Sequence, residues 1–92
     1  MMDAIKVIDQ VYVTSTGVNA LPSSDAGFYR LTARGACWVQ FGSGGSFSVA
    51  SNDYNVFVPE SGSVIVHTSE PQFNGLEVGG SLGLSVEGLA GV

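Results

Sequence analysis

Hydrophobic and polar residues alternate along most of this chain, which predicts β-strands throughout. The first alternating run, residues 5–13, separates two faces: Ile5, Val7, Val11 and Val13 on one side, with Lys6, Ile8, Gln10 and Tyr12 on the other. Asp9 interrupts the apolar face, so we expect this strand to lie at a sheet edge or to contain an irregularity. No stretch shows the 3.6-residue period of a helix, so helix content should be close to zero.

Further strand-like segments recur along the chain, separated by Gly, Pro, Asn and Ser. They cover residues 28–32, 36–41, 56–58, 63–68, 73–78 and 82–86. Residues 14–22 predict a loop, and Arg34-Gly35 predicts a tight hairpin between two neighbouring strands. A spacing of about 8–12 residues between strands is typical of a small β-sandwich, jelly roll or barrel. The pattern therefore predicts a single antiparallel β-sandwich or jelly-roll-like barrel of about seven or eight strands.

The length of 92 residues corresponds to one domain, residues 1–92. Within it we expect residues 1–13 to form an N-terminal strand or arm and residues 87–92 to form a C-terminal tail. A domain of this size has a thin core and usually needs a disulfide, a metal or an oligomer for support. One cysteine and one histidine cannot supply an internal disulfide or a zinc site. We therefore expect no metal and no cofactor, and support from oligomerisation or docking.

The charge balance narrows the choice of partners. The chain has three basic and eight acidic residues, which give a net charge of -5. Binding to nucleic acid or to an anionic membrane is therefore not expected. Only 12% of the residues are charged, so small polar residues or another protein must cover the surface. The N-terminus lacks a signal-peptide pattern and no apolar run is long enough to span a bilayer, which predicts synthesis in a cytoplasm.

Candidate catalytic residues do not form a recognisable motif. His67 is interpreted as an ordinary strand histidine, and Cys37, between Ala36 and Trp38, as a buried small hydrophobic residue. The glycines of residues 42–46 lack the Lys-Ser/Thr of a phosphate loop, and residues 52–55 lack the glycine and distal glutamate of an EF-hand loop. No Gly-x-Ser-x-Gly nucleophile motif occurs, and the acidic residues are scattered near turns. The sequence therefore predicts no enzyme.

Aromatic and apolar residues are more numerous than a thin core requires. Amphipathic rings are enriched at protein interfaces, and apolar terminal segments can reach neighbouring subunits. We therefore predict that an interface is formed by Ile5, Val7, Val11, Tyr12, Trp38, Tyr54 and Phe73.

Several segments, taken in order, resemble a recurring type of small virion protein of tailed bacteriophages. The resemblance spans residues 28–86 and is carried by Phe28-Tyr29-Arg30-Leu31-Thr32, Gly35-Ala36-Cys37-Trp38-Val39-Gln40-Phe41-Gly42, Val49-Ala50-Ser51, Val56-Phe57-Val58-Pro59 with Gly62, and Gly83-Leu84-Ser85-Val86. Proteins of this type are β-sandwich or jelly-roll modules, and several are capsid cement or decoration proteins that sit as trimers on the outer head surface.

The resemblance implies a non-enzymatic virion protein that is made in the host cytoplasm and located on the outer capsid surface. Its partners would be copies of itself, as a homotrimer, and the major capsid protein. One alternative is another virion role, as a head-to-tail connector or fibre-base component. A second alternative is a carbohydrate-binding β-sandwich that uses Trp38, Tyr54 and Asp53 to stack on and hydrogen-bond a sugar.

Overall fold

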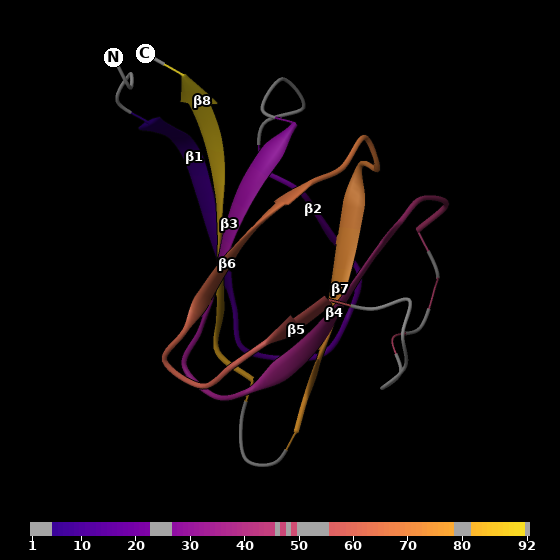
Figure 1. The fold of residues 1–92 in the computed structure, drawn as a ribbon. Helices are drawn as coiled ribbons and strands as arrows, with labels where there is room; N and C mark the ends of the chain where they lie inside the picture. Colours follow the sequence, from indigo (N-terminus) through magenta and orange to yellow (C-terminus); the bar gives the residue numbers. More distant parts are fainter. Residues whose placement is uncertain are drawn as a thin grey trace.

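The computed structural model describes residues 5–22, 27–45, 47, 49, 56–78 and 82–91, and no helix occurs in these ranges. Eight strands form two four-stranded antiparallel sheets (Figure 1). In chain order the strands are β1 (Ile5–Val13), β2 (Asn19–Ala20), β3 (Phe28–Ala33), β4 (Cys37–Gly42), β5 (Val56–Val58), β6 (Ser63–His67), β7 (Gln72–Glu77) and β8 (Leu84–Gly91). The predicted all-β sandwich and its number of strands are confirmed.

The strands pair in a nested order. β1 pairs with β8, β2 with β7, β3 with β6 and β4 with β5, so the chain is one long hairpin that has been rolled up. Two more pairings, β3 with β8 and β4 with β7, complete the sheets. The first sheet has the order β1-β8-β3-β6 and the second has the order β2-β7-β4-β5. This winding of eight strands into two sheets is that of a jelly roll.

The core lies between the two sheets and is formed by the inward side chains of each strand. In β3 the residues Tyr29, Leu31 and Ala33 are buried, and in β4 the residues Cys37 and Val39 are buried. This period of two follows from the strand geometry, in which successive side chains point to opposite faces. The other buried members of the core cluster are Leu21, Val58, Phe73, Leu82, Leu84 and Val86.

One buried polar side chain holds two loops against the second sheet. Asn74 of β7 is 5% exposed, and its Oδ1 atom accepts the backbone N–H of Gly17 at 2.9 Å. Its Nδ2 atom donates to the carbonyl oxygen of Phe47 at 3.0 Å. Because both ends of the amide are hydrogen-bonded, its burial carries little desolvation cost.

β1 is an edge strand and contains the expected irregularity near Asp9. Val7 lies opposite Leu89 while Asp9 lies opposite Gly88, so Ile8 is the extra residue of a β-bulge. The carboxylate of Asp9 accepts the backbone N–H of Gln10 at 2.8 Å and so supports the distorted backbone.

Because of the bulge, the side chains of β1 do not divide between the two faces of the sheet as predicted. Val11 lies opposite the buried Val86 and packs against the core, whereas Val7 lies opposite Leu89, which is three residues further along β8. An odd number of residues along a strand reverses the face, so Val7 and Val11 point to opposite sides of the sheet. The alternation in the sequence placed them on one face because a bulge cannot be counted from the residue pattern.

Three other expectations about strand boundaries are also wrong. Residues 87–91 are not a tail, because they continue β8 and pair with β1. Asn19–Ala20 lies in a predicted loop but pairs with β7 as the short strand β2. The turn at Arg34-Gly35 joins the two sheets instead of closing a hairpin, because β3 and β4 belong to different sheets. In each case the outcome depends on a partner strand that is distant in sequence.

Candidate interaction surfaces

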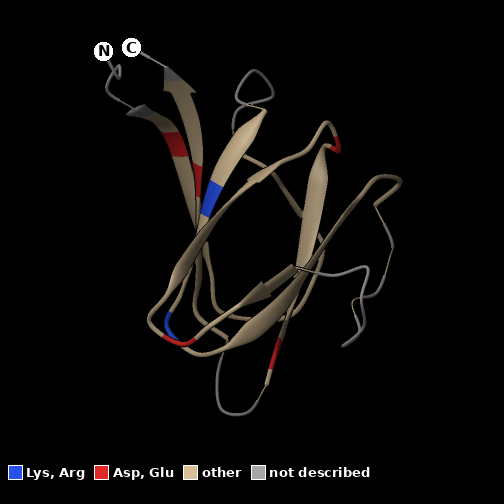
Figure 2. Ribbon diagram, in the orientation of Figure 1, with Lys and Arg blue, Asp and Glu red and all other residues tan. Residues whose placement is uncertain are grey.

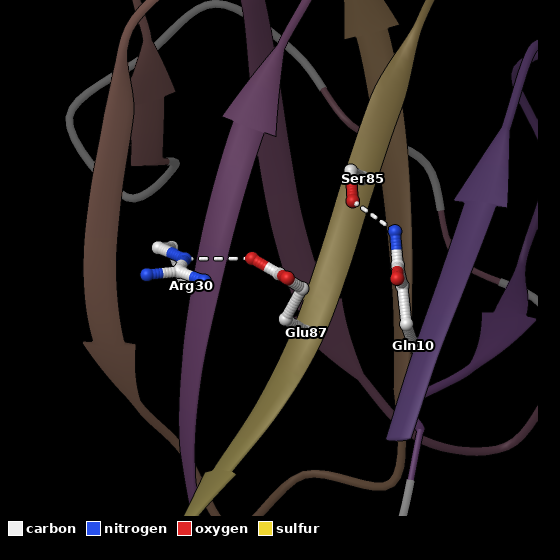
Figure 3. Close-up of polar contacts among 4 residues, drawn as sticks. All are labelled: Gln10, Arg30, Ser85 and Glu87. Atoms are coloured by element: carbon white, nitrogen blue, oxygen red, sulfur yellow. Dashed lines mark hydrogen bonds and ion pairs between the residues drawn. The ribbon is translucent and has the colours of Figure 1, made fainter. Parts of the chain in front are cut away.

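The outer face of the first sheet carries side chains in rows that run across the strands, because paired residues point to the same side. In the middle row, Arg30 Nε donates to Glu87 Oε1 at 2.6 Å, and this hydrogen bond and the charge of Glu87 raise the pKa of Arg30 (Figure 3). Next to them, Gln10 Nε2 donates to Ser85 Oγ at 3.0 Å. Ile65 lies opposite Arg30 on β6 and is 56% exposed. The row is thus polar in its centre and apolar at the β6 edge.

A second row on the same face is apolar. Leu89 of β8 lies opposite Val7 of β1 on one side and opposite Phe28 of β3 on the other. Phe28 is paired with His67 of β6, and the centres of their rings are 4.7 Å apart. Val7 and Phe28 are 40% and 53% exposed, whereas Leu89 is buried without belonging to the inter-sheet core. Val7, Leu89 and Phe28 therefore form an apolar row on the outside of the sandwich, and the imidazole of His67 ends this row at the β6 edge.

The second sheet has an aromatic pair on its outer face. Trp38 of β4 lies opposite Phe57 of β5, and the two ring centres are 5.0 Å apart at an interplanar angle of 57°. On its other side Trp38 lies opposite Leu76 of β7, which is also apolar. Trp38 is half-buried and Phe57 is 43% exposed. Both outer faces of the sandwich therefore expose apolar side chains where an isolated sandwich would place polar ones.

The predicted interface residues fall in different environments. Tyr12, on the outer face opposite Ser85, is 52% exposed, and Val7 and Trp38 also reach the surface. Ile5 begins β1 opposite Gly91. Tyr54, like Asp53, lies outside the described residues.

Two of the predicted interface residues face the core. Phe73 is fully buried between the sheets, opposite Phe41 of β4, so it presents no surface to a partner. Val11 is partly buried and packs against the core. The sequence pattern does not place Phe73 in the core, because the alternation within one strand does not say which of its two faces lies inward.

The structure adds exposed apolar residues that the sequence analysis did not single out. They are Ile8, Phe28, Phe57, Ile65 and Val78, all at least 37% exposed. The alternation of the sequence could have indicated Phe28 and Ile65. Each of them is followed or flanked in its strand by a buried or half-buried residue, so its own side chain points to the opposite, outer face.

Charged side chains are sparse over the described chain (Figure 2). The only ion pair among the described residues is that of Arg30 with Glu87. Arg34 packs its aliphatic stem close to Gly83, and its backbone N–H donates to the Gly83 carbonyl at 2.7 Å. Glu60 and Glu70 are exposed at opposite ends of β6.

A pocket of about 140 Å³ lies beside the end of β6. Among the described lining residues, Glu70 carries the one carboxylic acid, whereas glycoside hydrolysis uses a pair of carboxylates. The other lining residues are Leu21, Tyr29, Thr68, Ser69 and Pro71.

Cys37 is fully buried, as interpreted from its neighbours in the sequence. Burial, and to a smaller degree the charge of Glu77, raise the pKa of the thiol to about 11. At neutral pH the side chain is therefore a protonated thiol within the core.

Within the described ranges, no three His, Cys, Asp or Glu side chains come together in a way that could hold a metal ion. The same ranges contain no helix that is long and apolar enough to cross a membrane. Comparison with known proteins found no matching protein family, no matching curated protein and no matching solved structure.

Proposed function

We propose that this protein is a non-enzymatic structural component of a bacteriophage virion, a decoration protein that binds the outer surface of the capsid as a homotrimer. The observation that carries the proposal is the exposure of seven large hydrophobic side chains, each between 37% and 57% exposed. Some of these side chains adjoin, in the row around Phe28 and in the pair of Trp38 and Phe57, and grouped apolar surface of this kind supports protein contacts in a chain whose charged content is only 12%.

The composition supports the outer surface as the location. Each chain carries a net charge of -5, so an oligomer would be strongly acidic and would be repelled by packaged DNA. Three linked copies would bind a threefold-related patch with effective concentrations of about 1 mM, so weak individual contacts would add up to tight binding. Stabilisation of the lattice in this way needs binding surface and no catalytic group.

Light scattering tests the oligomer. We expect a stable species of three times the 9.5 kDa chain mass, and a monomer that persists at high concentration would contradict the trimer. Trp38 is a predicted interface residue and Phe57 is one of the seven exposed hydrophobic residues, so substitution of both by Ser should weaken the oligomer while leaving the core intact.

Cosedimentation with expanded capsids that lack the protein tests the location. We expect binding to the major capsid protein lattice in a copy number that follows the lattice sites. A few copies per particle, at the portal or at the fibre base, would support the connector or fibre-base alternative instead. Binding to a glycan array that is lost in Trp38→Ala would support the carbohydrate alternative. The two described residues that lie opposite Trp38 are apolar, namely Phe57 and Leu76.

A further inference from the structure

The described strands leave four sheet edges, and three of them are protected against further pairing. The edge strand β1 contains a bulge and a charged residue, Asp9. β2 has two residues, and β5 has three and is followed by Pro59. Bulges, charges, proline and short length are the features by which proteins prevent a sheet edge from pairing with another chain.

The fourth edge, β6, has none of these features. Its five residues, Ser63–His67, include no proline and no acidic or basic residue other than His67. Its pairing with β3 continues over all five residues without a register shift. β6 is therefore the one described edge that is regular, uncharged at its centre and long enough to accept a further strand.

The hydrogen bonds at the two ends of β6 show which backbone groups point outward. The N–H of Thr68 donates to the carbonyl of Gly27 at 2.9 Å, and the carbonyl of Gly62 accepts the N–H of Ala33 at 3.2 Å. Hydrogen-bonding groups alternate along an antiparallel pair, so the even-numbered residues of β6 face β3. The outward N–H and C=O groups, which have no backbone partner among the described residues, belong to Ser63, Ile65 and His67.

The side chains around this edge define what could pair with it. Val64 and Val66 are half-buried against the core, while Ile65 is 56% exposed on the outer face. A strand placed beside β6 would therefore meet an apolar, β-branched neighbour on each face. Cross-strand contacts between β-branched residues are favourable, so the centre of the added strand should be uncharged and β-branched.

Charge distinguishes between the candidate occupants. Glu60 and Glu70 are exposed at the two ends of β6, whereas Arg30 is engaged by Glu87 and Arg34 packs against Gly83. An antiparallel second copy centred on Ile65 would bring Glu60 of each copy towards Glu70 of the other, a like-charge repulsion at both ends. A segment with basic residues at its ends would instead complement the two glutamates.

We propose that the free edge of β6 accepts an extended segment of a partner protein as an added strand, with an uncharged β-branched centre flanked by lysine or arginine. This is β-augmentation, in which backbone hydrogen bonds supply affinity and the side chains supply selectivity. The inference rests on the proposed function only for the identity of the partner, which would then be the major capsid protein.

A synthetic peptide of seven alternating threonine and valine residues, with two lysines at each end and a fluorescent label, is the probe. We expect saturable binding by fluorescence anisotropy below about 1 mM. The same peptide with alternate backbone amides methylated should not bind, because it has lost the donors that face β6. A peptide with glutamates in place of the lysines should bind more weakly, and exchange of both Glu60 and Glu70 for Lys should reverse this preference.

A matched pair of variants tests the edge itself. Ile65→Pro removes an outward N–H without removing a hydrogen bond to β3, and proline is tolerated at such edge positions. We expect it to weaken peptide binding about tenfold, roughly the effect of one lost hydrogen bond. Ile65→Thr keeps the N–H and a β-branched side chain, so it should bind like the parent protein. Circular dichroism establishes that both variants are folded, and the methylated peptide tests the edge without any change to the protein.

Several outcomes would overturn this inference. They are the absence of binding by the lysine-flanked peptide, equal binding of the methylated peptide, and equal binding by the Pro and Thr variants. Self-association that Ile65→Pro abolishes would identify a second copy as the occupant instead. If Ile65→Pro binds capsids as well as the parent protein does, the β6 site is rejected and the proposed function stands. If neither the parent protein nor any variant binds capsids, the proposed function is rejected.

Discussion

Replacement of Phe73 by Ala should destabilise the fold far more than replacement of any surface phenylalanine. Phe73 is fully buried, and its strand is paired on one side with β4 and on the other with β2. Removal of a buried phenyl ring costs about 3–5 kcal/mol, because both the transfer free energy and the cavity count against the fold. A domain of this length has a total stability of about 5–14 kcal/mol, so the variant would lose a large part of it.

Urea unfolding followed by tryptophan fluorescence measures this loss, since Trp38 is the single tryptophan. With a slope of about 1.5 kcal/mol/M, the midpoint of Phe73→Ala should fall by about 2–3 M. Phe73→Leu, which keeps most of the volume, should lose about 1–2 kcal/mol and keeps the measurement possible if the alanine variant does not fold.

Phe57 provides the matched control for Phe73. It is 43% exposed and contacts Trp38, so Phe57→Ala should cost about 1 kcal/mol, the value of one aromatic pair. Equal losses for the two alanine variants, or a loss below about 1 kcal/mol for Phe73→Ala, would refute the assignment of Phe73 to the core and restore it as an interface candidate.

Three further predictions concern single features of the fold. Because burial raises the pKa of Cys37 to about 11, the folded state retains a proton that the unfolded state releases, so the free energy of unfolding should fall as the pH rises from about 9 to 11. Cys37→Ala should remove this part of the pH dependence in urea titrations at each pH. A double-mutant cycle on Arg30 and Glu87 should give a coupling of about 0.2–1 kcal/mol that decreases with salt, because the Arg30 side chain is 40% exposed. Gly83→Ala should lower the thermal midpoint by the equivalent of about 1–3 kcal/mol, because the new Cβ atom would lie 2.8 Å from Tyr12 Oη and 2.9 Å from Arg34 Cβ. A midpoint within 1–2 °C of the parent would show that the two side chains move aside freely.

The candidate surfaces were predicted in part. The sequence indicated that apolar and aromatic residues exceed the needs of a thin core, and Val7, Tyr12 and Trp38 do reach the surface. It did not indicate the apolar row around Phe28, because that row joins residues from four strands that are far apart in the sequence. It also did not indicate the open edge at β6, since an edge is defined by the absence of a neighbour.

The sequence alone determined the class of the fold. The period of two, the spacing of turn residues and the irregularity at Asp9 are local properties, because they arise from the dihedral preferences and side-chain directions of a few consecutive residues. The tertiary structure decided everything that depends on a partner strand. In the pairing with β8, Ile8 is the extra residue of a bulge, so alternate residues before and after it point to opposite faces and not to the one face predicted. Asn19–Ala20 is a strand because it pairs with β7, and Phe73 is buried because the two sheets pack together. These outcomes follow from contacts between distant segments, whose closure entropy and packing no local pattern encodes.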